Sequence, residues 1–136
     1  MTLAAAGRSP SGFGLWAPVV AYMAVIFGLS AMSAPPAPPQ VNDKLEHFLA
    51  FGGLALLALR ATTRARWASL SWTTAGVAWA IAAAYGVSDE VHQAFVPGRT
   101  PDAADVLADA LGAAVALIVA GAFGIIRRSR HPADAA

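Results

Sequence analysis

Long apolar runs alternate with short polar segments along the chain. The runs cover residues 15–31, 45–60, 67–88 and 105–126. A bilayer core of about 30 Å is crossed by about 20 mostly apolar helical residues, within a range of about 17–25. Three of the runs fall in that range, and the run over 45–60 is slightly shorter. The pattern therefore predicts an all-α fold, a bundle of four transmembrane helices that forms one domain over residues 1–136.

The segment that follows the first run breaks the apolar pattern with prolines. It reads SAPPAPPQ at residues 33–40, a composition that favours a short extended connector. Arg8 before the first run and the small residues SAMSA at 30–34 also suit a signal peptide. The run exceeds the roughly 7–15 apolar residues of a signal peptide, however, and prolines crowd the cleavage site. We therefore expect the run to be retained as a transmembrane helix.

The composition supports a membrane protein. Hydrophobic residues make up 57% of the 136 residues and charged residues only 12%, whereas soluble domains carry about 25% charged residues. A soluble chain of this size has too much surface to bury so much apolar area. The chain has no cysteine, which excludes disulfides, cysteine-ligated metals and thiol nucleophiles.

Basic residues gather on one side of the predicted bundle. Seven of the nine lie before the first run, between the second and third, or after the fourth: Arg8, Arg60, Arg64, Arg66, Arg127, Arg128 and Arg130. The positive-inside rule makes this side cytoplasmic. We therefore predict a multi-pass protein of the plasma (inner) membrane, with both termini and a tail at 127–136 in the cytoplasm.

The opposite side, predicted to be the outer face, receives the acidic residues. Seven of the eight acids fall there: Asp43, Glu46, Asp89, Glu90, Asp102, Asp105 and Asp109. The remaining two bases, Lys44 and Arg99, lie with them. The stretch SDEVHQAFVPGR at residues 88–99 concentrates much of this polar chemistry. Polar groups from three separate segments are thus predicted to meet at one rim of the bundle.

The fourth run carries small residues at a spacing of four, namely Gly112, Ala116, Ala120 and Gly124. Such a face lets a partner helix approach closely in a membrane, where packing holds helices together. A chain rich in alanine also scatters small residues by chance, so both interpretations stay open.

Asp105 and Asp109 share one face at the start of the fourth run. Asp105 suits the N-cap of the helix that it begins, where an acid is favoured. Asp109 lies one turn deeper, where an ionisable group needs a partner or water. Arg99 is the partner that we expect, because its planar guanidinium matches a carboxylate in two-point fashion.

Several interpretations of the polar residues stay open. Salt bridges between helix ends would need no ligand, since structural ion pairs mimic functional sites. A metal would be held by His47 with Asp89 and His92, because Asp89 and His92 have the spacing of a ligand pair. A general base would be His92 or His47, oriented by Asp89 or Glu90.

Recognition of an anion is the interpretation that we favour over metal chemistry. Arg99 and Lys44 are the two bases among many acids, and together with helix N-terminal amides they suit a phosphate or carboxylate. We accordingly predict no metal and no cofactor, and we assign no catalytic residue. Ser88 stands beside these groups but lacks the motif of an activated nucleophile.

The chain resembles the VanZ-like family of small membrane proteins, named for a teicoplanin-resistance protein. The resemblance rests on DKLEHFLAFGGLALL from Asp43 and on YGVSDEVHQAFVPGRTPDAADVLADALGA from Tyr85. It implies a bacterial multi-helix membrane protein that is linked in some members to low-level glycopeptide resistance. The family's polar signature falls on Lys44, His47, Asp89, Glu90, His92, Gln93, Arg99 and Asp105. Asp109 departs from the pattern, in which asparagine is expected, and this puts in doubt whether the same partner is bound.

Three functional hypotheses follow for this chain. The leading one is a membrane protein whose outward-facing polar site binds or acts on a cell-envelope component, an anionic ligand or one related to glycopeptides. The second is a membrane-embedded enzyme, a hydrolase or transferase of a lipid-linked substrate, that uses a histidine and a carboxylate. The third is a purely structural or partner-binding bundle. We expect the lipid bilayer, and not a nucleic acid, as its surroundings.

Overall fold

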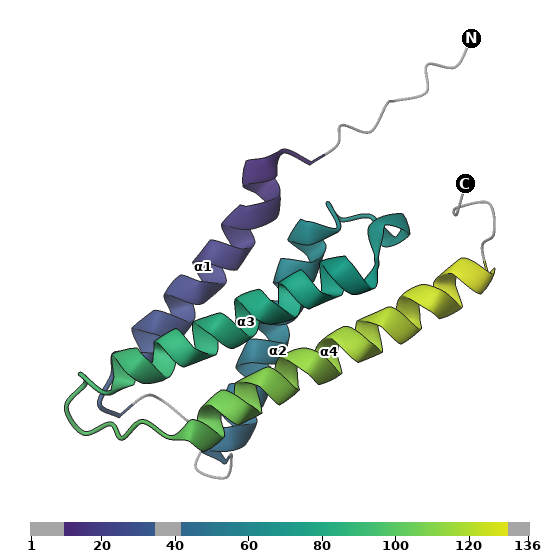
Figure 1. Ribbon diagram of the computed structural model, residues 1–136. Coiled ribbons are helices and arrows are strands. Elements are labelled where there is room, and N and C mark those ends of the chain that lie inside the picture. The colour runs from purple at the N-terminus through teal and green to yellow at the C-terminus, as the bar shows by residue number, and fades with distance from the viewer. Residues whose placement is uncertain (1–9, 35–41, 131–136) are drawn as a thin grey trace.

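The computed structural model describes residues 10–34 and 42–130, and most of these residues lie in helices. The α-helices are α1 Gly12–Ser30, α2 Asp43–Thr62, α3 Trp72–Gln93 and α4 Ala103–Arg130, and a short 3₁₀ helix, η1, covers Trp67–Ser69 (Figure 1). Within the described ranges no residue lies in a strand. The predicted all-α class with four helices is therefore confirmed. Residues 35–40 of the proline-rich connector, Arg8 and residues 131–136 of the predicted tail lie outside the described residues.

The helices begin and end at residues that differ somewhat from the predicted runs. α3 begins later, at Trp72, because Ser71 and Thr74 form a capping box in which each side chain accepts a hydrogen bond from the other's backbone N–H. α3 also continues to Gln93, so much of the polar stretch that starts at Ser88 is helical. α4 continues to Arg130, which makes the start of the predicted tail helical as well.

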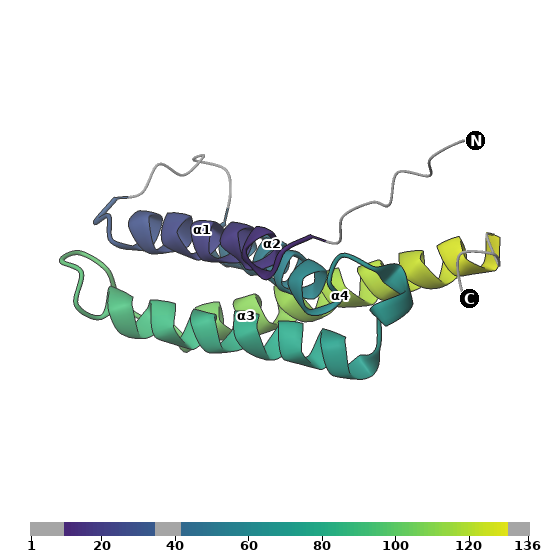
Figure 2. The ribbon, with the colours of Figure 1, turned by 90° about the horizontal axis from the view of Figure 1, so that it is seen from above.

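α2 is the central helix and contacts each of the other three. Successive helices run in opposite directions (Figures 1 and 2). The end of α1, the start of α2, the end of α3 and the start of α4 therefore share one end of the bundle, which we call the polar end. We call the opposite end, with Arg60, Arg64 and Arg66, the basic end. α1 also contacts α3, and there the Tyr85 hydroxyl donates to the Met23 carbonyl at 2.7 Å.

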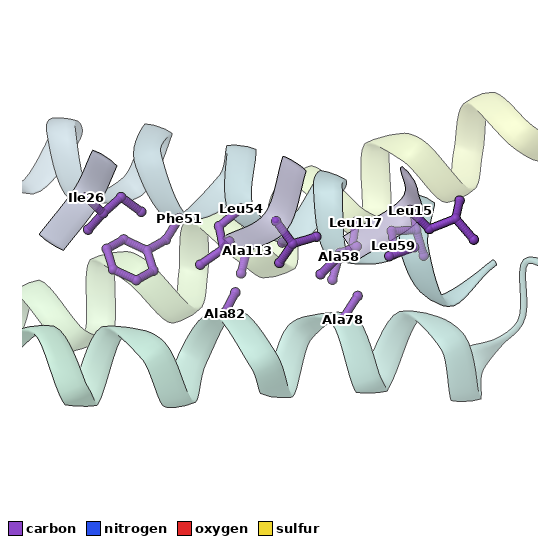
Figure 3. Packing of buried hydrophobic residues seen from close by; sticks show 13 residues of the cluster. Leu15, Ile26, Phe51, Leu54, Ala58, Leu59, Ala78, Ala82, Ala113 and Leu117 are labelled. Carbon is purple, nitrogen blue, oxygen red and sulfur yellow. The ribbon is translucent and has the colours of Figure 1, made fainter. Parts of the chain in front are cut away.

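The core is an apolar seam along the inner faces of the helices. Figure 3 shows small side chains of α3, Ala78 and Ala82, pointing at the larger side chains of the neighbouring helices. Large apolar side chains on the outer faces are exposed, and each helix has such residues: Val20, Leu49, Val91 and Ile118 are examples. An exposed apolar surface of this kind suits a membrane, because soluble monomers rarely expose large contiguous apolar patches.

α2 and α4 cross closely at two glycines. A Cβ added at Gly112 would overlap the Phe48 carbonyl, and one added at Gly52 would lie 3.2 Å from the Gly112 carbonyl oxygen. Ala116 packs against Gly52 one turn further along α4. The first two members of the predicted small-residue face therefore lie at the contact with α2, where small residues let two backbones approach.

Three of the described helices are long and apolar enough to cross a membrane: α1, α2 and residues 103–124 of α4. The chain is thus a membrane protein by length and composition of its helices. α3, with 22 residues, also has the length of a membrane span. That α3 crosses the membrane, and that both termini are cytoplasmic, stay predictions.

Candidate functional site

Polar side chains of α2, α3 and α4 meet at the polar end of the bundle. All the residues that the sequence nominated for ligand binding lie at this end, although they do not form one set: Lys44, His47, Asp89, Glu90, His92, Gln93, Arg99 and Asp105. That they bind a ligand stays a prediction.

A tight turn between α3 and α4 directs Arg99 back onto α3. The Arg99 N–H donates to the Val96 carbonyl at 3.1 Å, and Gly98 has a φ of +83°. Pro97 followed by a glycine with positive φ is the signature of a type II turn. The sequence VPGR therefore sets the position from which the Arg99 side chain reaches α3.

Arg99 acts on Asp89 through Gln93. The guanidinium Nε and Nη2 both donate to Gln93 Oε1, at 3.1 and 2.8 Å. Gln93 Nε2 in turn donates to Asp89 Oδ2 at 2.9 Å. Gln93 and Asp89 are both buried. The shared helix face that the spacing of four predicts is thus present, and it is extended by Arg99 from the following loop.

Asp109 pairs with His47 and not with Arg99, so the predicted partner is wrong. His47 Nδ1 lies 3.0 Å from Asp109 Oδ1, and both side chains are buried. Asp109 sits on α4 opposite Gly86 of α3, where an added Cβ would come within 2.5 Å of Asp109 Oδ2. Arg99 is directed elsewhere because its short turn places it beside the end of α3, whereas Asp109 lies one turn inside α4.

Lys44 is held by two carboxylates of the loop and first turn of α4. Its Nζ lies 2.6 Å from Asp102 Oδ2 and 2.6 Å from Asp105 Oδ1. Asp105 is buried, whereas the side chains of Lys44 and Asp102 are partly accessible. The ammonium hydrogen bond lowers the pKa of the Asp102 carboxyl below its usual value. Lys44 is therefore engaged in joining α2 to α4.

The N-cap of α4 is Asp102 and not Asp105. Asp102 Oδ1 accepts from the Ala104 N–H at 2.8 Å, which is the bond of an N-cap side chain. The helix begins at Ala103, so Asp105 falls in its first turn and its side chain is free to meet Lys44. The prediction that Asp105 caps the helix fails because the helix starts earlier than the apolar run.

Glu90 ties the end of α3 to the same loop. Its Oε2 accepts from the Asp102 N–H at 2.8 Å. Its Oε1 is buried and has no hydrogen-bond partner among the described residues. A buried carboxylate oxygen without a partner is costly, which makes Glu90 a candidate to contact something that the protein itself does not supply.

Two sets of side chains at the polar end have the composition and spacing of metal ligands. His47, Asp89 and Glu90 form one set, and Asp43, His47 and Asp105 form the other; within each set the candidate ligand atoms lie within 4.8 Å of one another. His92, which the sequence grouped with Asp89 and His47, belongs to neither set. Its ring stacks on Phe27 of α1 with ring centroids 4.2 Å apart.

A cavity of about 120 Å³ opens beside these residues. Its polar lining includes His47, Asp89 and Arg99, and also Asp43 and Glu46, which were not nominated from the sequence. One face of α2 carries Asp43, Glu46, His47 and Ala50 at helical spacing. This spacing could have indicated from the sequence that Asp43 and Glu46 lie beside His47. The part of the lining that comes from α1 is mostly apolar and consists of Ile26 and Leu29 with Ser30.

Comparison with known proteins gives one result that bears on this site. A family model described as VanZ/LLP1 matches residues 23–124, a range that includes every residue of the site. No match was found among curated proteins or among solved structures.

Proposed function

The chain belongs to the VanZ/LLP1 family, and on that premise we propose that this membrane protein binds an amphipathic component of the cell envelope at its polar end. The observation that carries the proposal is the two-sided cavity of about 120 Å³. Its polar wall on α2 and α3 suits a head group. Its apolar wall on α1, with Ile26 and Leu29, suits a hydrocarbon chain, because burying apolar area is favourable.

The charges of the lining favour a head group that presents ammonium or hydroxyl donors. Three acids, Asp43, Glu46 and Asp89, line the cavity, against one base, Arg99. The anionic ligand that the sequence favours would have to approach Arg99 past these acids. Lys44, the other base at this end, already lies 2.6 Å from two carboxylates. The geometry thus supports an envelope component whose head group is a hydrogen-bond donor.

We further propose that the polar end faces the outside of a bacterial inner membrane. The arginines at residues 64 and 66 lie at the basic end and are exposed, and an excess of basic residues is typical of cytoplasmic loops. The chain has no cysteine, so single-cysteine variants can be labelled cleanly in intact cells with an impermeant maleimide. We expect Thr100→Cys to be labelled from outside and Ala68→Cys only after lysis. The reverse pattern would place the cavity in the cytoplasm.

The functional test uses glycopeptide susceptibility, because the family resemblance is linked to resistance. We expect expression of the chain in a susceptible bacterium to raise the minimal inhibitory concentration of teicoplanin. Asp89→Asn and Arg99→Gln should each abolish that increase, whereas Ser88→Ala, exposed on the same turn, should keep it. The amount of protein in the membrane is measured for each variant. If both variants fold and keep the increase, the chain is a structural or partner-binding bundle.

A second candidate function, an enzyme, is favoured by the pairing of His47 with Asp109. A carboxylate 3.0 Å from Nδ1 holds an imidazole in one orientation, as a general base requires. His47 also lines the cavity, whereas His92 stacks on Phe27. This candidate predicts a bell-shaped pH dependence of the teicoplanin effect. The pH dependence should disappear in His47→Asn and persist in His92→Asn; loss in both variants would argue against it.

A further inference from the structure

We propose that His47, Asp89 and Glu90 bind a divalent transition-metal ion, and that Asp109 positions His47 for it. One ring nitrogen of His47 and one carboxylate oxygen from each acid lie within 4.8 Å of one another. The ligands of a zinc ion lie about 2.0–2.2 Å from the metal, which places them closer to one another than 4.8 Å. Small rotations of the three side chains would bring their ligand atoms to that spacing. The inference goes beyond the proposed function: the metal would use Asp89, whereas Asp43 and Glu46 of the cavity would stay available to a donor head group.

The burial of the three ligands points to a metal and not to a solvated acidic surface. His47, Asp89 and Glu90 are 8%, 4% and 6% exposed. None of the basic side chains among the described residues forms a salt bridge with Asp89 or Glu90. Two buried carboxylates so close together repel each other and lose hydration. A divalent cation between them would neutralise both charges.

A partnerless atom supports this assignment independently of the spacing. Glu90 Oε1 is buried and lacks a hydrogen-bond partner among the described residues, although Oε2 accepts from the Asp102 N–H. Buried carboxylate oxygens are normally satisfied. A bound cation supplies the contact that Glu90 lacks, and the Asp102 bond keeps the carboxylate in place while it does so.

Asp109 occupies the position of a residue that orients a metal ligand. Histidines that bind metals almost always donate their other ring N–H to a carboxylate, a carbonyl or water, which fixes the tautomer. Asp109 Oδ1 lies 3.0 Å from His47 Nδ1, which leaves Nε2 as the nitrogen that binds the ion. Asp109 replaces the asparagine expected from the family resemblance, and a carboxylate is the stronger acceptor for this N–H.

The donor set indicates the class of metal. One imidazole nitrogen with two carboxylates suits zinc, manganese or iron better than calcium or magnesium, which prefer oxygen alone. Three protein ligands with one open position are the arrangement of accessible zinc sites. His47 and Asp89 both line the cavity, so the open position would face it. We therefore expect Zn²⁺ to bind more tightly than Mg²⁺.

The second set of candidate ligands is weaker as a site. Asp43 is exposed, and Asp105 is already 2.6 Å from Lys44 Nζ. A cation there would compete with the ammonium group, whereas a cation at Glu90 would displace nothing among the described residues. The two sets share His47, so substitution of the acids distinguishes them.

The test measures Zn²⁺ affinity of the full chain, purified in detergent and stripped with EDTA, by competition with a chromogenic chelator. We expect one Zn²⁺ per chain. Glu90→Gln keeps an oxygen to accept from the Asp102 N–H but loses the charge, and it should weaken binding by more than about 100-fold. Asp109→Asn should weaken it by about 10–100-fold, the usual effect of removing a residue that orients a ligand.

Matched variants make the result decisive. Asp102→Asn removes a carboxylate from the same end but keeps the N-cap, and Asp43→Asn removes one from the competing set; both should retain the affinity of the wild type. Asp89→Asn serves as the second ligand variant if Glu90→Gln fails to fold. Equal affinity of wild type, Glu90→Gln and Asp89→Asn would overturn the proposal. So would a loss confined to Asp43→Asn, which would move the ion to the other set.

Discussion

The two ends of the bundle carry opposite charges and use them in different ways. At the basic end the arginines at residues 64 and 66 are exposed, and the Arg60 guanidinium donates to the Gly14 carbonyl at 3.4 Å. At the polar end four carboxylates are buried, those of Asp89, Glu90, Asp105 and Asp109. Several of their hydrogen bonds join different helices or a helix and a loop.

The difference in burial fits the two roles that we propose, charge that orients the chain and charge that forms a site. Exposed arginines are hydrated, and in the proposed orientation they contribute to the excess of positive charge on the cytoplasmic side. Buried carboxylates are costly unless they are paired. The polar end nevertheless retains four of them in the packed interior. Substitutions at the two ends should therefore have very different effects.

The largest effect is expected where a buried pair is broken. His47→Leu leaves Asp109, which is fully buried, without its partner, and removal of one member of a buried pair costs about 3–5 kcal/mol. The measurement is the free energy of unfolding in a detergent titration. The double variant His47→Leu with Asp109→Leu should recover much of the loss, because no charge stays unpaired. A double variant as unstable as the single one would contradict this account.

Two glycines of α3 provide a matched comparison within one helix. Gly86→Ala, near the polar end, places a Cβ 2.5 Å from Asp109 Oδ2 and 3.0 Å from Asp109 Cβ, and such overpacking costs about 1–3 kcal/mol. Asp109 cannot withdraw freely because His47 holds it. Gly76→Ala, towards the basic end, meets nothing within 4 Å and should stabilise by about 0.5–1 kcal/mol.

The free energies of unfolding of the two glycine variants should therefore change in opposite directions. Equal destabilisation by both would mean that α3 is uniformly packed. In that case the contrast between the two ends would not extend to its packing.

A smaller, pH-dependent effect is expected at the accessible pair of Lys44 and Asp102. The pKa of Asp102 is lowered by Lys44, so the folded state binds fewer protons there than the unfolded state. The stabilisation is complete above the usual carboxyl pKa and is lost as the pH falls through the lowered value. Asp102→Asn keeps the N-cap and should flatten the acidic side of a melting-temperature profile. An unchanged profile would show that the pair contributes nothing.

The smallest effect on stability is expected at the basic end. Arg64→Gln and Arg66→Gln should change the free energy of unfolding by less than about 0.5 kcal/mol, as surface substitutions usually do. The same variants weaken the bias that orients the chain. Maleimide labelling of Thr100→Cys in that background should then become mixed. A large loss of stability would show that these arginines pack as the polar end does.

The sequence predicts the architecture well and the pairing poorly. The apolar runs and the charge asymmetry are enough to predict an all-α chain of four helices, because a membrane constrains the length and composition of each helix that crosses it. Helix ends are set instead by local capping, as Ser71 and Asp102 illustrate. The cap at Asp102 shifted Asp105 into the helix and left it to pair with Lys44.

The partners of buried groups depend on helix packing, which spacing alone cannot supply. Asp109 meets His47 because Gly112 lets α4 approach α2 and Gly86 leaves room on α3. Spacing placed Asp89 and Gln93 on one face, and their hydrogen bond agrees with that. Spacing also grouped His92 with them, but the ring stacks on Phe27 of α1. Only the packing of the helices shows which of these residues share a site and which do not.

The position of α2 has a consequence for how the chain is made. His47 and Asp109, whose buried side chains form a hydrogen bond, are 62 residues apart in the sequence, so α2 is synthesised before α4. Until α4 is made, His47 and Gly52 of α2 lack the helix that packs against them in the complete fold. The packing of α2 is therefore completed only when the last helix of the chain has been made.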